Sequence, residues 1–142
     1  MREIKFRGKA CGEWVSGSLI VCEDGHSVIN YVDGLRHVST DIGVVPETVG
    51  QFTGLRDCKR QEIYEGDILS FLPPRMLLTT RTRIIAPVQY RDDGFFVVLS
   101  HCDYSLKYIL QRDPSAHVIG NILDNPDLLY NDKQSEKSEE VE

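Results

Sequence analysis

An all-β fold is the class that this sequence predicts, and three observations support the prediction. The apolar segments are short and rich in Val, Ile, Phe and Tyr, which favour strands. Gly, Asp, Asn and Pro separate these segments at short intervals, as turns require. No window shows a sustained helical period of apolar residues. Many short strands joined by frequent turns are typical of a β-barrel or a β-sandwich.

The first 46 residues are expected to form an N-terminal β-unit. Residues 4–10 alternate apolar and basic side chains, as a half-buried strand does. A second strand is predicted at residues 14–22, where Gly17 indicates a bulge or a close backbone approach. Asp33-Gly34 separates strands at 27–32 and 35–38, and both residues tolerate the positive φ of a two-residue type I′ turn. A composition shift near residues 43–47 places the boundary of this unit after residue 46.

Residues 47–130 are expected to form a second β-region. Its strands are predicted at residues 49–55, 62–72, 83–91, 95–101, 105–110 and 117–123. Pro73-Pro74 ends the second of these strands because proline cannot donate to a ladder. The turn Asp92-Asp93-Gly94 marks the clearest hairpin, and Asn125-Pro126-Asp127 is expected to begin a final helical turn through Tyr130.

Composition and charge exclude several functional classes. The 142 residues include 41% hydrophobic and 27% charged residues, with a net charge of −6, a globular balance. Residues 131–142 carry −3 of that charge and are expected to form an acidic, disordered tail. An acidic chain is a poor general nucleic-acid binder, because phosphate neutralisation needs clustered Lys and Arg. Without an apolar span or signal core, a cytoplasmic location without membrane contact is expected.

No catalytic residue, metal site or cofactor is predicted from the cysteines and histidines. The cysteines have wide spacing that fits neither a zinc ribbon nor a disulfide framework, and they are Cys11, Cys22, Cys58 and Cys102. Reduced, partly buried thiols are therefore expected. The run from Ser100 to Asp103 contains His101 and Cys102, but neighbours on a strand face apart. They therefore cannot easily act as a nucleophile and base or share a zinc ion.

Four acidic residues surround the centre of the chain, namely Asp57, Glu62, Glu65 and Asp67. Their spacing is not that of a calcium-binding loop. They are interpreted as turn and strand-edge residues, since aspartate side chains often bond turn amides. A divalent cation held by these oxygens is the alternative.

The segment 73–83 is the one stretch that favours a contact function. It contains Arg75, Arg81 and Arg83 and no acidic residue, and it lies between two predicted strands, where binding loops are common. Arginine makes paired hydrogen bonds to phosphate, so these three residues are candidate contacts for nucleic acid or a partner. The apolar residues 76–78 need cover, which another subunit would provide. A solvated loop or a charged edge strand is the simpler interpretation.

Three motifs distinguish the chain. They are REIKFRG at residues 2–8, followed by Trp14 and Gly17; TGLRD and EIYEGDIL within residues 53–69; and HVIGNILDNPDLL at residues 117–129. Together they resemble the YopX family of phage and prophage proteins over residues 2–130. The turn at residues 58–61 departs from the Asn-Gly-like turn usual in that family. The resemblance implies a mostly-β protein with a small Src homology 3-like barrel in the second half, and it transfers no catalytic residue.

The function expected from this reading is that of a non-enzymatic phage or prophage accessory protein. It would act by protein–protein contact, with an unidentified partner or with itself. The alternative is a weak, salt-sensitive nucleic-acid-binding module that uses the loop 75–83. An enzyme would require a pocket that gathers perturbed acids, which the sequence does not indicate.

Overall fold

The computed structural model describes residues 2–73, 82–100 and 102–129. Most of the described residues lie in antiparallel strands, which confirms the all-β prediction. The chain divides into two compact units, Met1–Gly54 and Leu55–Glu142, so the division falls later than the expected boundary after residue 46. Neither α1 nor any other helix in the described residues has the length and apolar character needed to cross a membrane.

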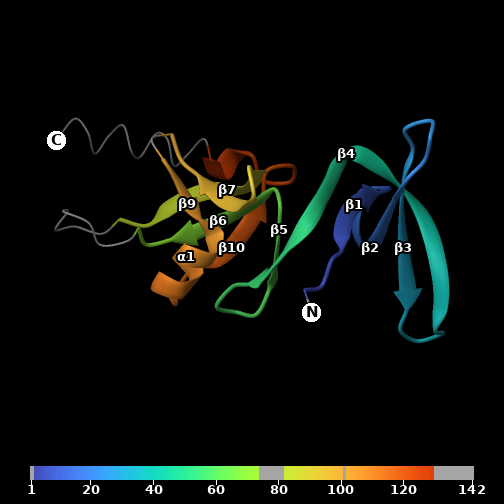
Figure 1. The fold of residues 1–142 in the computed structure, drawn as a ribbon, viewed down its shortest axis with the longest axis horizontal. Coiled ribbons are helices and arrows are strands. Elements are labelled where there is room, and N and C mark those ends of the chain that lie inside the picture. The colour runs from blue at the N-terminus through green and yellow to red at the C-terminus, as the bar shows by residue number, and fades with distance from the viewer. Residues whose placement is uncertain (1, 74–81, 101, 130–142) are drawn as a thin grey trace. The chain divides into compact units, whose positions relative to one another are not determined.

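Four antiparallel strands build the first unit (Figure 1). They are β1 (Phe6–Ala10), β2 (Glu13–Val21), β3 (Ser27–Asp33) and β4 (Val38–Arg56), the last of which continues into the second unit. Strand β1 pairs with both β2 and β4, and β3 also lies between β2 and β4, so each strand has two partners within this unit. Strand β4 also pairs with β5. A small core of Ala10, Ile29 and Val44 lies among these strands.

Strand β2 changes partners beside Gly17. Residues 13–17 pair with β1, and residues 18–21 pair with β3. A Cβ atom on Gly17 would lie 2.1 Å from the carbonyl oxygen of Asn30, far inside any real contact. The close backbone approach predicted for Gly17 is therefore confirmed, and the absence of a side chain permits the change of partner.

The turn between β3 and β4 differs from the predicted two-residue type I′ turn. Asp33 pairs with Val38, so residues 34–37 form the turn, and positive φ falls on His37 (54°). The side chain of Asp33 accepts a hydrogen bond from the backbone N–H of Leu35 (2.9 Å). This local bond stabilises a longer turn, and the strand expected at residues 35–38 begins only at Val38.

The second unit contains a five-stranded antiparallel sheet, a short helix and a short strand. Its elements are β5 (Glu62–Tyr64), β6 (Asp67–Phe71), β7 (Ile84–Arg91), β8 (Gly94–Val98), β9 (Asp103–Ser105), α1 (Leu106–Arg112) and β10 (His117–Asn121). The strand order in the sheet is β10-β6-β7-β8-β9. The predicted hairpin at Asp92-Asp93-Gly94 is confirmed, because Arg91 pairs with Gly94.

The strand predicted at residues 62–72 is two strands, β5 and β6, separated by Glu65 and Gly66. Gly66 has a φ of 93°, which glycine adopts at no steric cost. Asp67 is only 2% exposed, and its Oδ2 accepts a hydrogen bond from the N–H of Tyr64 at 2.7 Å. The expected bonding of a turn amide by Asp67 is present, and the bend at Gly66 divides the single strand that was predicted here.

The prediction of a strand at residues 105–110 is wrong, because the helix α1 begins at Leu106. Leu106 and Ile109 are both completely buried, and residues three apart lie on one face of a helix. Their spacing therefore matches a helix packed on the sheet better than a strand. The predicted helical turn after Asn125 is confirmed at residues 127–129, where Leu128 N–H donates to the Asn125 carbonyl (3.2 Å).

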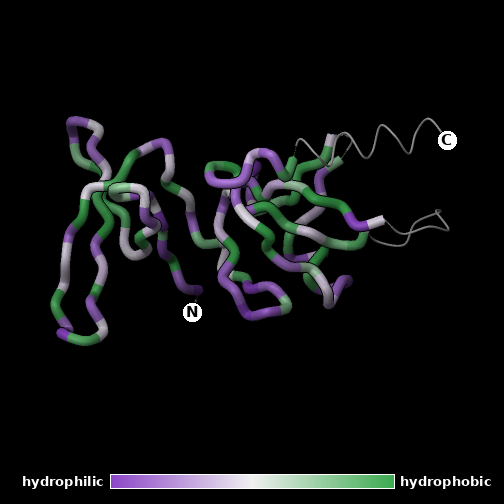
Figure 2. The backbone as a smooth tube through the Cα atoms, turned by 180° about the vertical axis from the view of Figure 1, so that it is seen from behind, coloured by the Kyte–Doolittle hydropathy of each residue, from purple (hydrophilic) through white to green (hydrophobic). Residues whose placement is uncertain are grey.

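The core of the second unit is larger than that of the first. Its buried residues come from β5 to β8, α1 and the turn before β10: Ile63, Leu69, Phe71, Ala86, Val88, Val97, Leu106, Ile109 and Ala116. Hydrophobic positions are concentrated along the strands of this unit (Figure 2). Burial of apolar surface on this scale is the main stabilising term for a domain of this size.

Candidate functional site

Arg83, the one described member of the predicted arginine cluster, links two segments of the second unit by hydrogen bonds. Its Nε and Nη2 donate to the hydroxyl and carbonyl oxygens of Ser70 at 2.9 and 3.0 Å. Its Nη1 and Nη2 donate to the hydroxyl and carbonyl oxygens of Ser115 at 2.9 and 3.1 Å. A guanidinium has five N–H donors, so most of this group is already used. Arg75 and Arg81 lie outside the described residues.

Asp113 completes this polar cluster, and its 7% exposure places it in the interior. Its carboxylate accepts hydrogen bonds from the N–H of Leu72 (2.7 Å) and from the N–H and hydroxyl of Ser115 (2.9 and 2.6 Å). Burial alone would raise the pKa of Asp113, but these hydrogen bonds and the charge of Arg83 lower it below the ordinary value of 3.8. The carboxylate is therefore ionised at neutral pH and joins β6 to the turn after α1.

Sequence reasoning missed the structural function of Asp113 and Ser115. The signal was local, since Asp-Pro-Ser at residues 113–115 is typical of a turn closed by an aspartate side chain. The hydrogen bonds between Arg83 and Ser115 could not be predicted from the sequence. The two residues come close because β6 pairs with both β7 and β10.

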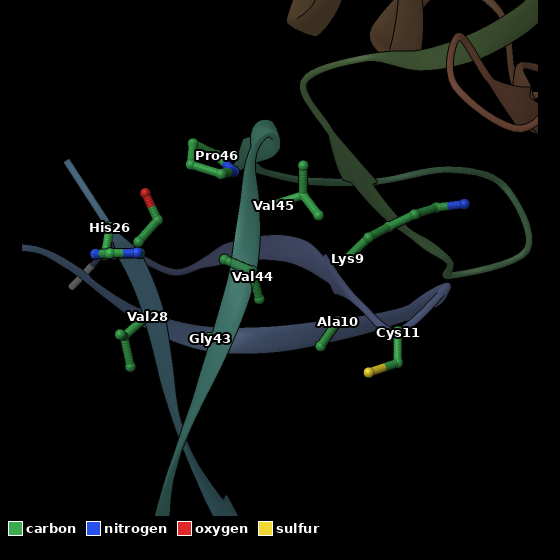
Figure 3. A pocket seen from close by; sticks show the side chains of 10 residues that line it. Lys9, Ala10, Cys11, His26, Val28, Gly43, Val44, Val45 and Pro46 are labelled. Atoms are coloured by element: carbon green, nitrogen blue, oxygen red, sulfur yellow. The ribbon is translucent and has the colours of Figure 1, made fainter.

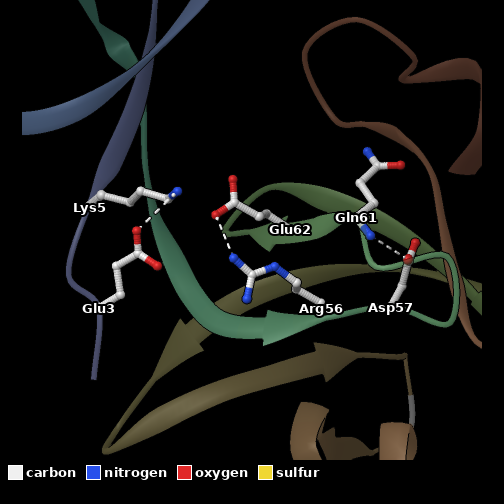
Figure 4. A network of polar contacts seen from close by, with 6 residues as sticks. All are labelled: Glu3, Lys5, Arg56, Asp57, Gln61 and Glu62. Carbon is white, nitrogen blue, oxygen red and sulfur yellow. Dashed lines mark hydrogen bonds and ion pairs between the residues drawn. The ribbon is translucent and has the colours of Figure 1, made fainter. Parts of the chain in front are cut away.

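The central acidic residues Asp57 and Glu62 bond backbone amides and an arginine side chain, respectively. Asp57 Oδ1 accepts from the N–H groups of Lys59 and Gln61 (both 2.9 Å), and Oδ2 accepts from Val118 N–H (2.9 Å). Figure 4 shows the Asp57–Gln61 bond beside a 3.5 Å ion pair between Arg56 and Glu62. Within the described ranges, no three His, Cys, Asp or Glu side chains are grouped so that they could hold a metal ion.

All four cysteines are unpaired thiols, and all four are exposed rather than partly buried as expected. Turn geometry explains the difference for Cys11, which has a φ of 52° and joins β1 to β2. His101 lies outside the described residues, so the Ser100–Asp103 run shows no nucleophile–base pair that can be measured.

An open depression of about 450 Å³ lies on the first unit (Figure 3). Ala10, Val28 and Val44 contribute apolar walls from β1, β3 and β4, and Cys11 and His26 contribute polar groups. The His26 ring is hydrogen-bonded to the Asp24 carboxylate at 2.6 Å. Among the described contacts none joins His26 to Cys11.

The most exposed apolar side chain of the described residues lies on the hairpin arm, the name used here for residues 31–40 at the far end of β3 and β4. Leu35 is 94% exposed, and Val32 and Val38 are 63% and 52% exposed. Strand β2 pairs with β3 only as far as Asn30, so beyond it the hairpin arm is a two-stranded ribbon extending past β1 and β2 (Figure 1).

Polar contacts at the base of the hairpin arm keep this ribbon in register. The side-chain amide of Asn30 donates to Ser39 Oγ (2.7 Å) and to Asp41 Oδ1 (2.6 Å) across the two strands. An isolated two-stranded ribbon is only marginally stable in water. A protein that retains one with exposed apolar residues presents a surface suited to contact with another molecule.

These features define a class: an all-β chain of two compact units with an exposed apolar hairpin arm. The YopX protein family model matches residues 5–130, and the chain belongs to that family. The crystal structure of protein EF1440 from Enterococcus faecalis is similar, with a TM-score of 0.56 and 25% sequence identity over 91% of this chain and 99% of that chain. A comparison with curated proteins finds no match.

Proposed function

We propose that this chain is a non-enzymatic phage or prophage accessory protein that binds another protein in the cytoplasm through its hairpin arm. The 94% exposure of Leu35 is the observation that carries the proposal. Val32 and Val38 widen the apolar surface around it. Covering such side chains is favourable in proportion to the area removed from water.

The second unit supports the proposal as a scaffold. We infer a small Src homology 3-like barrel from five antiparallel strands that share one core with α1. The polar cluster of Asp113, Arg83 and their serine partners joins its strands internally. Among the described residues, the first unit has more exposed large apolar side chains than the second.

Comparative affinity capture tests this function. Tagged full-length wild type, Leu35→Lys and Leu123→Lys would each be expressed in the native host, and captured proteins would be quantified by mass spectrometry. Leu123 is a matched control, because it is also an exposed leucine (45%) but lies in the second unit. We expect Leu35→Lys to lose at least about tenfold of a specific partner, the loss typical of a removed apolar anchor. Equal capture by all three proteins would contradict the proposal.

The nucleic-acid alternative stays a prediction, and no contact among the described residues favours it. Arg83 should be left unchanged in its test, because replacing it would disturb the second unit. Fluorescence anisotropy with labelled DNA and RNA would compare wild type with Arg75→Glu/Arg81→Glu at low and near-physiological salt. Binding that weakens with salt and is lost in the double variant would support this alternative.

A further inference from the structure

Strand β4 has an open edge along the hairpin arm and its base. Residues 38–44 pair with β3 on one side. On the other side, β1 reaches β4 only from Val45 onward, where Lys9 is its partner. In the described part of the chain, no strand pairs with this second edge of residues 38–44. Such an edge presents unpaired N–H and C=O groups to any strand that can align with it.

The side chains of this edge are complementary to themselves in one antiparallel register. If Thr40 lies opposite Thr40 of a second copy, Ser39 faces Asp41 and Val38 faces Ile42. Each of these is a favourable cross-strand pair: hydroxyl with hydroxyl, hydroxyl with carboxylate, and apolar with apolar. Val38, which is 52% exposed, would gain an apolar neighbour.

The two registers shifted toward the C-terminal end of β4 are worse for identifiable reasons. Centring the pair on Asp41 places two carboxylates directly opposite each other, which is destabilising. Centring it on Ile42 sets residues 39 and 38 of the second copy beside Val45 and Pro46, respectively. That edge of β4 already belongs to β1 at Val45. The register centred on Thr40 avoids both problems.

We infer that a second copy of this chain pairs antiparallel with the open edge of β4, with the two-fold axis at Thr40. The inference rests on the proposed function, because it names the protein that the hairpin arm contacts. The result is one continuous sheet through β3 and β4 of both copies, held by main-chain hydrogen bonds and specified by alternate side chains.

Disulfide trapping tests the register in the full-length chain. The four exposed cysteines would be changed to serine, and Thr40→Cys or Asp41→Cys would then be added. Residues directly opposite in an antiparallel pair have Cα atoms about 4.5–5.5 Å apart, within the range that a disulfide spans. Under mild oxidation we expect Thr40→Cys to form covalent dimers at least about tenfold faster than Asp41→Cys. Faster linkage through Asp41→Cys, or none through either, would overturn the inference.

A second measurement keeps the native cysteines. Sedimentation velocity over a concentration series would compare Ser39→Lys with Ser39→Asp. Both lose the hydroxyl that Asn30 bonds, but only the lysine is opposite in charge to Asp41 of the second copy. We expect the dimer of Ser39→Asp to have a Kd at least about tenfold higher than that of Ser39→Lys. Residue 39 of each copy faces Asp41 of the other, so the dimer contains two such pairs, which repel in Ser39→Asp and attract in Ser39→Lys. Equal constants, or monomers throughout, would overturn the inference; if Leu35→Lys still loses a captured protein, the proposed function stands without it.

Discussion

Gly17→Ala should lower the free energy of unfolding of the first unit by about 3 kcal/mol or more, the upper range for overpacking. The new Cβ would lie 2.1 Å from the Asn30 carbonyl oxygen and 3.2 Å from Cγ2 of Ile29. The first of these contacts is with backbone, so β2 and β3 must separate where β2 changes partners. Relief by a side-chain rotation is therefore not available.

Gly43→Ala is the matched control for this experiment. Gly43 also lies in a strand of the first unit, but a Cβ there has no heavy atom within 4 Å. Its effect should be within about 0.5 kcal/mol, as for ordinary surface substitutions. Hydrogen exchange of β2 and β3 amides, measured by mass spectrometry, reports on this unit directly. Similar protection in the two variants would contradict the clash.

Asp113→Ala should destabilise the second unit by about 3 kcal/mol, because it leaves three partly buried donors without their acceptor and removes a negative charge near Arg83. Leu72 N–H, Ser115 N–H and the Ser115 hydroxyl all lose a hydrogen bond. Denaturant unfolding followed by circular dichroism would measure the loss. Asp127→Ala removes an exposed carboxylate from the same unit and should change stability by no more than about 0.5 kcal/mol.

The effect of Asp113→Ala should also depend on pH in a defined direction. The pKa of Asp113 is lower in the folded chain than its ordinary value of 3.8. Its stabilising contribution is therefore complete above that value and is lost as the pH falls through the lower, folded pKa. The stability difference between wild type and Asp113→Ala should be constant near neutral pH and shrink below pH 3.8. A difference that grows on acidification would contradict the assignment.

Local chemical signals explain which parts of the fold were predictable. The hairpin at residues 92–94 and the bonding of a turn amide by Asp67 depend on residues close in sequence, and both were predicted correctly. Helix α1 was missed because it has only seven residues, too few to show a sustained period, and because Tyr108 and Ile109 also favour strands. Its two buried residues become informative only once the sheet beneath them exists.

The candidate site was less predictable, and for a different reason. Val32, Leu35 and Val38 have the composition of core strand residues, so nothing local indicates that they are exposed. The exposure of Val32 and Val38 follows from where β2 stops pairing with β3, which is a property of the whole unit, and that of Leu35 follows from its place in the turn at residues 34–37. Arg83 is the opposite case, because its sequence context suggested an exposed contact residue. Its side chain instead donates hydrogen bonds to Ser70 and Ser115, which lie far from it in sequence.

The 19-residue strand β4 runs past the division between the two units at Gly54 and Leu55. Domains that recombine as separate modules are usually joined by exposed linkers that few contacts cross. In this protein the division falls within a strand, so a genetic exchange at that point would cut an element that contributes to both units. The two units are therefore expected to be inherited together, as one indivisible piece of coding sequence.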